Sequence, residues 1–231
     1  MKRSTCFLLS ALVLAAIPAS AGPEHKNLQV LPKAITNVEL KKMMDGFTEQ
    51  LGVKCTFCHV LEQYEKDDRP HKADARRMIR LVFDMRAKKS VYFGPRTKDA
   101  AITCSTCHRG KAEPELLLTS LLPSINFLPP TSSPSAKPKN LQVLAKSTSA
   151  AEVQKVMDGF TTQLGVKCDF CHSSEQAKDD RPHKADARRM MKLVGDLKAR
   201  RADYFGPKTK ETVITCFMCH RGKAEPEAFV P

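Results

Sequence analysis

Four short segments of the sequence repeat one arrangement of cysteine and histidine. In each segment two cysteines stand three positions apart, and a histidine directly follows the second cysteine. The four segments are Cys55–His59, Cys104–His108, Cys168–His172 and Cys216–His220. The ninth cysteine, Cys6, lies near the start of the chain, so these motifs account for all the others.

This spacing is typical of covalent haem attachment. Two thiols on one short helical turn can each add to a vinyl group of the same haem, and the adjacent histidine then lies under the iron as its proximal ligand. A zinc ribbon, a thioredoxin-like redox pair and disulfides are the alternatives. Four copies, each with the adjacent histidine, favour haem. The sequence therefore predicts four covalent haem c groups with iron, attached through Cys55, Cys58, Cys104, Cys107, Cys168, Cys171, Cys216 and Cys219 and ligated by His59, His108, His172 and His220.

The sixth ligand of each iron is harder to assign. Besides the four motif histidines the chain has only His25, His71 and His183, which is one fewer than four bis-histidine haems need. Methionine is the natural substitute, because a thioether raises the haem potential and closes the site. Four methionines stand at matching places in the two halves of the chain, and core packing is the alternative for each. The candidates are Met44, Met78, Met157 and Met190, with His71 and His183 as rivals.

The chain repeats one unit twice. Lys26–His59 matches Lys139–His172 at an offset of 113, and from Asp67 onward the offset is 112. We therefore expect a first dihaem unit over residues 22–115 and a second over 139–231, joined by an apolar, then Pro/Ser-rich linker at 116–138. Residues 1–21 combine a basic start, a short apolar run and small residues, which predicts a cleaved signal peptide and a periplasmic or otherwise exported protein.

The elements that must position these residues are helices. Capping boxes at Thr36 and Ser149 and glycine stops at Gly52 and Gly165 predict helices over 37–51 and 150–164. A second helix is expected in each unit from Pro70 or Pro182 to Gly94–Pro95 or Gly206–Pro207, with an apolar face at helical spacing. The predicted fold is mainly α with few or no strands. With no tryptophan and 6% aromatic residues, the haems are expected to form much of the core.

The segments "MMDGFTEQLGVKCTFCH" and "ARRMIRLVFDM…ITCSTCHRG" resemble the haem-binding segments of the tetrahaem cytochrome subunit of photosynthetic reaction centres. The resemblance covers nearly all of the chain between the predicted signal peptide and its end, outside the linker. It implies helices that carry the axial methionines and haems arranged in two pairs. By this likeness Met44 serves the haem of Cys55/Cys58 and Met78 that of Cys104/Cys107. Met157 and Met190 serve the corresponding haems of the second unit.

The charge bears on the partners. The formal net charge is +13, but ionised haem propionates would offset much of it, which argues against nucleic acid as a partner. A moderately positive surface suits other redox proteins as electron donor and acceptor, with no membrane association beyond docking to a membrane complex. The sequence thus predicts an exported tetrahaem electron carrier and not an enzyme. The alternative is a multihaem oxidoreductase with one open haem iron acting on a small substrate.

Overall fold

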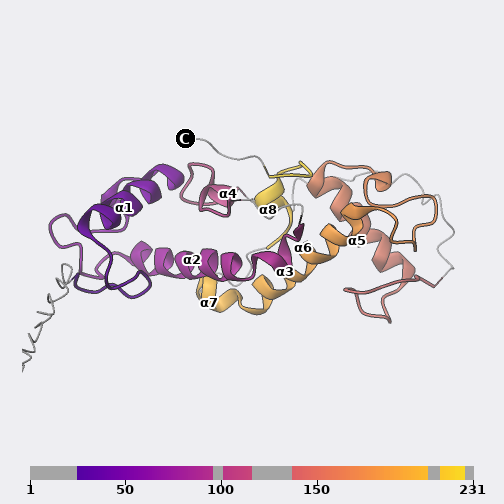
Figure 1. Cartoon of the computed structure of the whole chain (residues 1–231), viewed down its shortest axis with the longest axis horizontal. Helices are drawn as coiled ribbons and strands as arrows, with labels where there is room; N and C mark the ends of the chain where they lie inside the picture. Colours follow the sequence, from indigo (N-terminus) through magenta and orange to yellow (C-terminus); the bar gives the residue numbers. More distant parts are fainter. Residues whose placement is uncertain (1–24, 96–100, 116–136, 208–213, 227–231) are drawn as a thin grey trace, which may run out of the picture.

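The computed structural model describes residues 25–95, 101–115, 137–207 and 214–226. The predicted signal peptide and residues 116–136 of the predicted linker lie outside this part. The described residues form helices, turns and loops without a strand. The two repeats lie along one long axis, with α1 near one end and α5 near the other (Figure 1). The prediction of a mainly α fold is confirmed.

The first helix of each unit has the predicted bounds. Helix α1 spans Asn37–Leu51 and α5 spans Ala150–Leu164. Their N-caps, Thr36 and Ser149, each form a capping box with the glutamate three residues on. Glycines in the left-handed conformation end both helices, Gly52 at φ 63° and Gly165 at φ 62°. Local sequence thus determines these two helices at both ends.

The second helix of each unit is shorter than predicted. Helix α2 spans Pro70–Ala87 and α6 spans Pro182–Ala199, each with proline in its first turn. The backbone leaves the helical region at Lys88 and Arg200, and the short helices α3 (Lys89–Tyr92) and α7 (Arg201–Phe205) follow. The prediction of a single helix up to Gly94 or Gly206 was therefore wrong. The break has a tertiary cause: it turns α3 toward α6 and α7 toward α2, across the boundary between the units.

The buried core lies at this boundary. Nine buried side chains form one cluster, in which four positions recur in both units and Met218 is the ninth member. The cluster consists of Leu81, Met85, Tyr92, Ile102, Leu193, Leu197, Tyr204, Ile214 and Met218. Helices α1 and α5 contribute none and bury no residue of their own. The protein interior thus holds the two units together at the centre and leaves α1 and α5 without a buried apolar face.

Two buried tyrosines reinforce the boundary reciprocally. The Tyr92 hydroxyl donates to Asp196 at 2.5 Å, and the Tyr204 hydroxyl donates to Asp84 at 2.6 Å. Arg200 also donates to Asp84, at 2.7 Å, and lies over the Tyr204 ring. Each bond joins one unit to the other, and the two bonds are related by the sequence offset of the repeat. They contribute roughly 1.5–3 kcal/mol each, as expected for hydrogen bonds to charged acceptors.

We expect these bonds to make the boundary sensitive to alkali. Burial, and then the bond to Asp196, raise the pKa of Tyr92 to about 12. A folded-state pKa above the unfolded value of about 10 means that stability is fully present below pH 10 and is lost as the pH rises toward 12. Denaturant unfolding of the holoprotein with both Tyr92→Phe and Tyr204→Phe should show lower stability than wild type at pH 8 and a smaller loss between pH 10 and 12. Tyr64→Phe, at a 53% exposed tyrosine, is the control, and equal losses in wild type and double variant would contradict the expectation.

Candidate functional site

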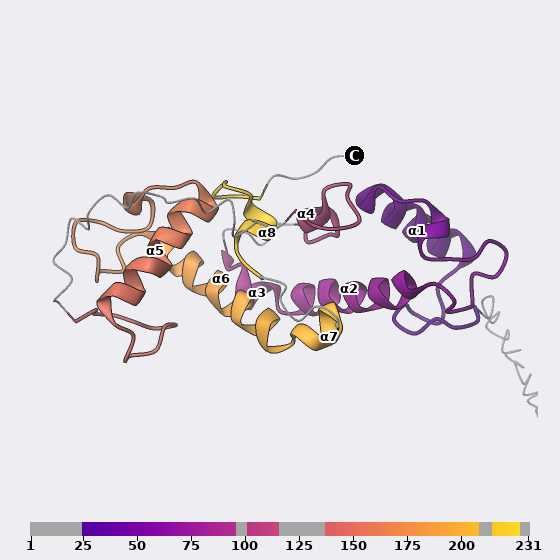
Figure 2. The ribbon, with the colours of Figure 1, turned by 180° about the vertical axis from the view of Figure 1, so that it is seen from behind.

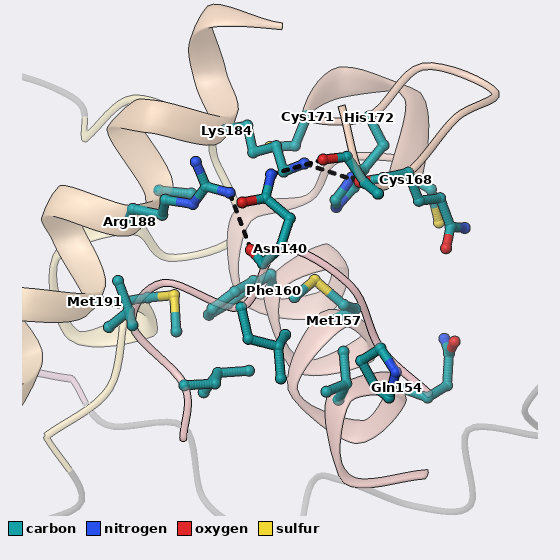
Figure 3. A pocket seen from close by; sticks show the side chains of 18 of the residues that line it. Asn140, Gln154, Met157, Phe160, Cys168, Cys171, His172, Lys184, Arg188 and Met191 are labelled. Carbon is teal, nitrogen blue, oxygen red and sulfur yellow. Dashed lines mark hydrogen bonds between the residues drawn. The ribbon is translucent and has the colours of Figure 1, made fainter. Parts of the chain in front are cut away.

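A cavity of about 550 Å³ opens beside the third cysteine–histidine motif. Figure 3 shows side chains pointing into it from α5, from α6 and from the motif itself. One wall is a stripe along α5 that includes Val153, Met157, Phe160 and Leu164. Leu141, Val143 and Leu144 extend the apolar surface, and the motif residues Cys168, Cys171 and His172 complete the lining. The size suits a cofactor-scale ligand.

Helix α5 shows why this cavity needs an occupant. The apolar side chains of α5 face the cavity at helical spacing, yet none of them is buried. An amphipathic helix of 15 residues is marginal without an apolar partner for that face. A large, flat, apolar group would supply the missing partner.

Each motif folds as one tight turn that brings its cysteines and histidine together. The first and third motifs contain the 3-10 turns Cys55–Phe57 and Cys168–Phe170, and the second and fourth contain the short helices α4 (Ser105–His108) and α8 (Phe217–His220). In all four the histidine amide donates to the carbonyl of the first cysteine, at 2.9–3.0 Å. All eight motif thiols are free. The spacing seen in the sequence therefore becomes one shared local geometry.

The rings of the four motif histidines are held in the same way. Each places Nδ1 at 3.0–3.1 Å from a backbone carbonyl a few residues later: His59 on Tyr64, His108 on Lys111, His172 on Gln176 and His220 on Lys223. A carbonyl only accepts, so Nδ1 must carry the proton. The Nε2 atom of the neutral ring is then left as a lone-pair donor for a metal. Burial also lowers the pKa of all four histidines, which favours the neutral form.

The second and fourth motifs meet at the centre of the molecule. Helices α4 and α8 are in contact, and the thiols of Cys107 and Cys219 lie against each other. This contact and burial raise the pKa of the Cys107 thiol well above its usual value. Arg221 donates to the Cys107 carbonyl at 3.0 Å, and Arg109 donates to the Cys219 carbonyl at 3.2 Å. The helices therefore follow one another along the long axis in the order α1, α4, α8, α5, as Figure 2 shows from behind.

The structure distributes the candidate methionines between the outer and central sites. Met157 lines the cavity of the third motif, and Met44 holds the matching position on α1. Met78 and Met190 instead pack against the central cluster, as Cys107 and Cys219 also do. Met191 also lines the third-motif cavity. Comparing the two repeats of the sequence did not identify Met191 as a candidate, because the equivalent residue of the first unit is Ile79.

The rival histidines make contacts of their own within the protein. His71 stacks on Phe57 and His183 stacks on Phe170, both with ring centroids 4.0 Å apart. His25 places Nε2 at 2.9 Å from the Ile35 carbonyl. His71 and His183 therefore lie beside the first and third motifs, because Phe57 and Phe170 stand between the two cysteines of those motifs.

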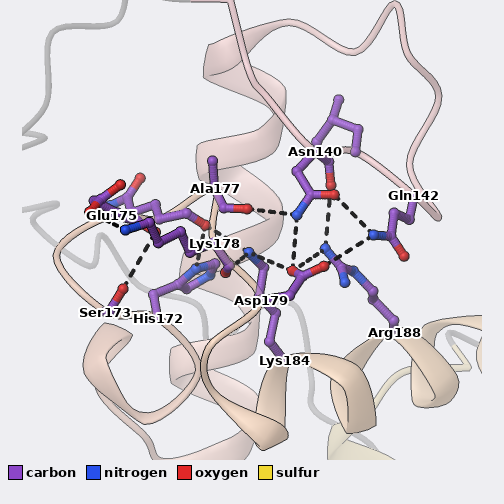
Figure 4. A network of polar contacts seen from close by, with 12 residues as sticks. Asn140, Gln142, His172, Ser173, Glu175, Ala177, Lys178, Asp179, Lys184 and Arg188 are labelled. Atoms are coloured by element: carbon purple, nitrogen blue, oxygen red, sulfur yellow. Dashed lines mark hydrogen bonds and ion pairs between the residues drawn. The ribbon is translucent and has the colours of Figure 1, made fainter.

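A polar network missed by the sequence analysis surrounds each outer histidine. In the second unit Asp179 forms ion pairs with Lys184 at 3.1 Å and Arg188 at 2.9 Å, and accepts from Asn140 (Figure 4). These partners, Arg188 first, hold the pKa of Asp179 well below its usual range. Asp67, Lys72, Arg76 and Asn27 repeat the arrangement in the first unit. The stretch "DDRPHKADARRM", identical in both units, contains most of this network.

These residues fit haem. The cavity offers an apolar wall, two free thiols, a histidine with Nε2 available and a thioether from Met157. Thiolate-derived attachment and His/Met ligation are the donor chemistry of c-type cytochromes. By contrast, a structural zinc site needs four convergent ligands, and the described residues contain no group of three or more His, Cys, Asp or Glu placed to hold a metal. None of the described helices is long and apolar enough to span a membrane.

Comparison with known families supports the same chemistry. The family model for the photosynthetic reaction centre cytochrome c subunit matches residues 13–124 and again residues 121–230. The chain belongs to this family. The double match confirms two tandem units, and membership implies covalently bound haem c with its iron. The chain is thus a haem-carrying cytochrome of electron transfer.

The individual relatives have low sequence identity to the chain, but two of them align with more than nine tenths of it. The reaction centre cytochrome c subunit of Rubrivivax gelatinosus is 24% identical, over 94% of this chain and 72% of the relative. That of Thermochromatium tepidum is 26% identical, over 91% of this chain and 64% of the relative. Cytochrome c-554 of Chloroflexus aurantiacus is 33% identical over 37% of this chain and 20% of its own length. The chain therefore spans 64–72% of the length of these two reaction centre subunits.

Proposed function

We propose that the protein is an exported tetrahaem c-type cytochrome that carries single electrons between redox partners through four covalently bound haems. Each haem is attached through the two cysteines of one motif and ligated by its histidine. The observation that carries the proposal is the shared histidine geometry, in which Nδ1 donates to a carbonyl at every motif and Nε2 is available to iron. Haem supplies the one-electron chemistry, and the chain supplies attachment, orientation and an apolar surrounding.

The arrangement of the motifs supports transfer along the molecule. Helices α4 and α8 are in contact, so the second and fourth motifs are neighbours, while the first and third lie toward the ends (Figure 1). An electron that enters at one end can therefore cross the centre and leave at the other. Donor and acceptor would be other redox proteins outside the cytoplasm. A reaction centre is one such partner, by analogy with the names of the relatives.

Methionine is the proposed sixth ligand at all four sites. Met157 lines the third cavity, and Met78 and Met190 pack against the same buried cluster as the central cysteines. Met44 occupies the equivalent place on α1. Ligation by both histidine and methionine raises the potential and leaves no iron open to substrate. This favours an electron carrier over an oxidoreductase.

Near-infrared magnetic circular dichroism of the oxidised holoprotein tests the ligands, and intact mass under denaturing conditions counts the covalent haems. We expect four haems per chain, all low-spin, with thioether charge-transfer bands. Predominantly bis-histidine signals would move the assignment to His71 and His183. A high-spin haem would indicate an open iron and support the oxidoreductase alternative. Fewer than four covalent haems would contradict the proposal itself.

A further inference from the structure

Two lysines are buried in the described part of the chain, and they hold equivalent places in the two units. Lys72 on α2 is 8% exposed and Lys184 on α6 is 9% exposed. Burying an ammonium group is costly unless it is fully hydrogen-bonded. A lysine that is buried twice at the same repeat position calls for a specific role.

Each ammonium uses its three N–H donors on the loop that follows the outer motif. Lys184 donates to the Gln176 carbonyl at 2.8 Å and the Lys178 carbonyl at 2.6 Å, and lies 3.1 Å from Asp179. Lys72 donates to the Tyr64 carbonyl at 2.7 Å and the Lys66 carbonyl at 2.6 Å, and lies 3.1 Å from Asp67. The donor capacity of an ammonium group is then complete.

One carbonyl in each loop is shared with the motif histidine. The Gln176 carbonyl accepts from Lys184 and also from His172 Nδ1, at 3.1 Å. The Tyr64 carbonyl accepts from Lys72 and also from His59 Nδ1, at 3.1 Å. Figure 4 shows Lys184 and His172 converging on this loop. The buried lysine therefore acts on the hydrogen bond that orients the proximal imidazole.

A lysine and an arginine share one carboxylate near each outer histidine. Asp179 is shared between Lys184 and Arg188, and Asp67 is shared between Lys72 and Arg76. One carboxylate thus faces two cations in each unit. At the second and fourth motifs the histidines instead donate to the backbone carbonyls of Lys111 and Lys223, within their own tight turns.

We propose that Lys72 and Lys184 are positioning residues that raise the reduction potentials of the two outer haems above the values these haems would otherwise have. This inference rests on the proposed haems at the first and third motifs. A cation on the shared carbonyl weakens its acceptance of the histidine Nδ1–H, so the imidazole donates less electron density to ferric iron. The buried ammonium group also disfavours ferric iron directly, since electrostatic interactions are stronger away from water. Both effects have the same sign.

The test is a spectroelectrochemical titration of the holoprotein carrying Lys72→Met and Lys184→Met. Two of the four haem transitions should move to lower potential, and the other two should stay in place. At a fixed applied potential the ratio of reduced to oxidised outer haem should fall about tenfold, which is 59 mV for one electron. Each single variant should move one transition.

Matched controls separate charge and hydrogen bonding from simple loosening of the loop. Lys66→Met and Lys178→Met remove neighbouring exposed cations but keep the loop carbonyls, and should leave all four transitions in place. Lys72→Arg with Lys184→Arg keeps a buried donor cation at both positions. The two outer haem potentials should therefore stay close to those of the wild type. Unchanged potentials in the methionine variants with four haems retained, or an equal shift of all four transitions, would overturn the inference. A wild-type protein without four haem transitions would instead contradict the proposed function.

Discussion

Loss of the haems at the two central motifs is expected to unfold most of the molecule, whereas loss of one outer haem should unfold only its own end. The central variant carries alanine at Cys104, Cys107, Cys216 and Cys219, and the outer variant carries alanine at Cys55 and Cys58. The central motifs contact each other and the only buried cluster among the described residues. Helix α1 buries no residue, so without its haem it loses its apolar partner while the centre stays intact.

Far-UV circular dichroism and hydrogen exchange followed by mass spectrometry check this expectation. The outer variant should lose protection in α1 and keep it in α2 and α6. The central variant should lose protection throughout and become protease-sensitive. A fully haem-free chain should be largely unstructured. A haem-free chain that remains compact and protease-resistant would contradict the view that haem forms much of the core.

The second large effect is expected at the glycine that ends the first helix. Gly52 has φ 63°, and a Cβ placed on it would lie 2.1 Å from the Gly110 carbonyl oxygen. Gly52→Ala combines the cost of a left-handed alanine, roughly 1–2 kcal/mol, with an overpacking cost of roughly 1–3 kcal/mol. The free energy of unfolding should fall by about 3 kcal/mol, because the contact that brings α1 against the second motif must open. Urea denaturation of the holoprotein measures it.

Gly46 in the same helix provides the matched control. It lies in the helix interior, and a Cβ placed on it would have only the Gln50 side chain nearby, at 3.5 Å. Gly46→Ala should stabilise the protein by roughly 0.5–1 kcal/mol, because alanine favours the helix. Gly165→Ala should repeat the Gly52 effect, since its Cβ would lie 2.0 Å from the Gly222 carbonyl oxygen. Equal effects at Gly46 and Gly52 would show that the close backbone approach is not the cause.

Features encoded in short stretches of sequence were predictable. The bounds of α1 and α5 follow from Thr36, Ser149 and two glycines, all of which act within a few residues. The cysteine–histidine turns follow from their spacing alone. The assignment of the four methionines as ligands stays a prediction, and the structure adds that they divide between outer and central sites.

Features that depend on contacts between distant residues were not predictable. Helix α2 ends at Ala87 because α3 packs on the other unit. The sequence around Lys88 contains no glycine or proline that would predict this end. The role of Lys72 was equally hidden, because lysine is ordinarily exposed and its carbonyl partners carry no sequence signature. The one indication in the sequence was that the polar stretch around Lys72 and Lys184 is identical in both units, which favours a structural role over simple exposure to solvent.

The reciprocal bonds Tyr92–Asp196 and Tyr204–Asp84 give the boundary between the units the character of a two-fold dimer interface contained within a single polypeptide. In a true homodimer such an interface must be strong enough to keep the subunits associated at their concentration in solution. Here the two halves belong to one chain, so their effective concentration relative to each other does not fall on dilution. A modest cluster of nine buried side chains is then sufficient to keep the halves associated. The two halves are not required to be identical, so one can change in sequence while it stays associated with the other. Met191 already differs from Ile79, the equivalent residue of the first unit.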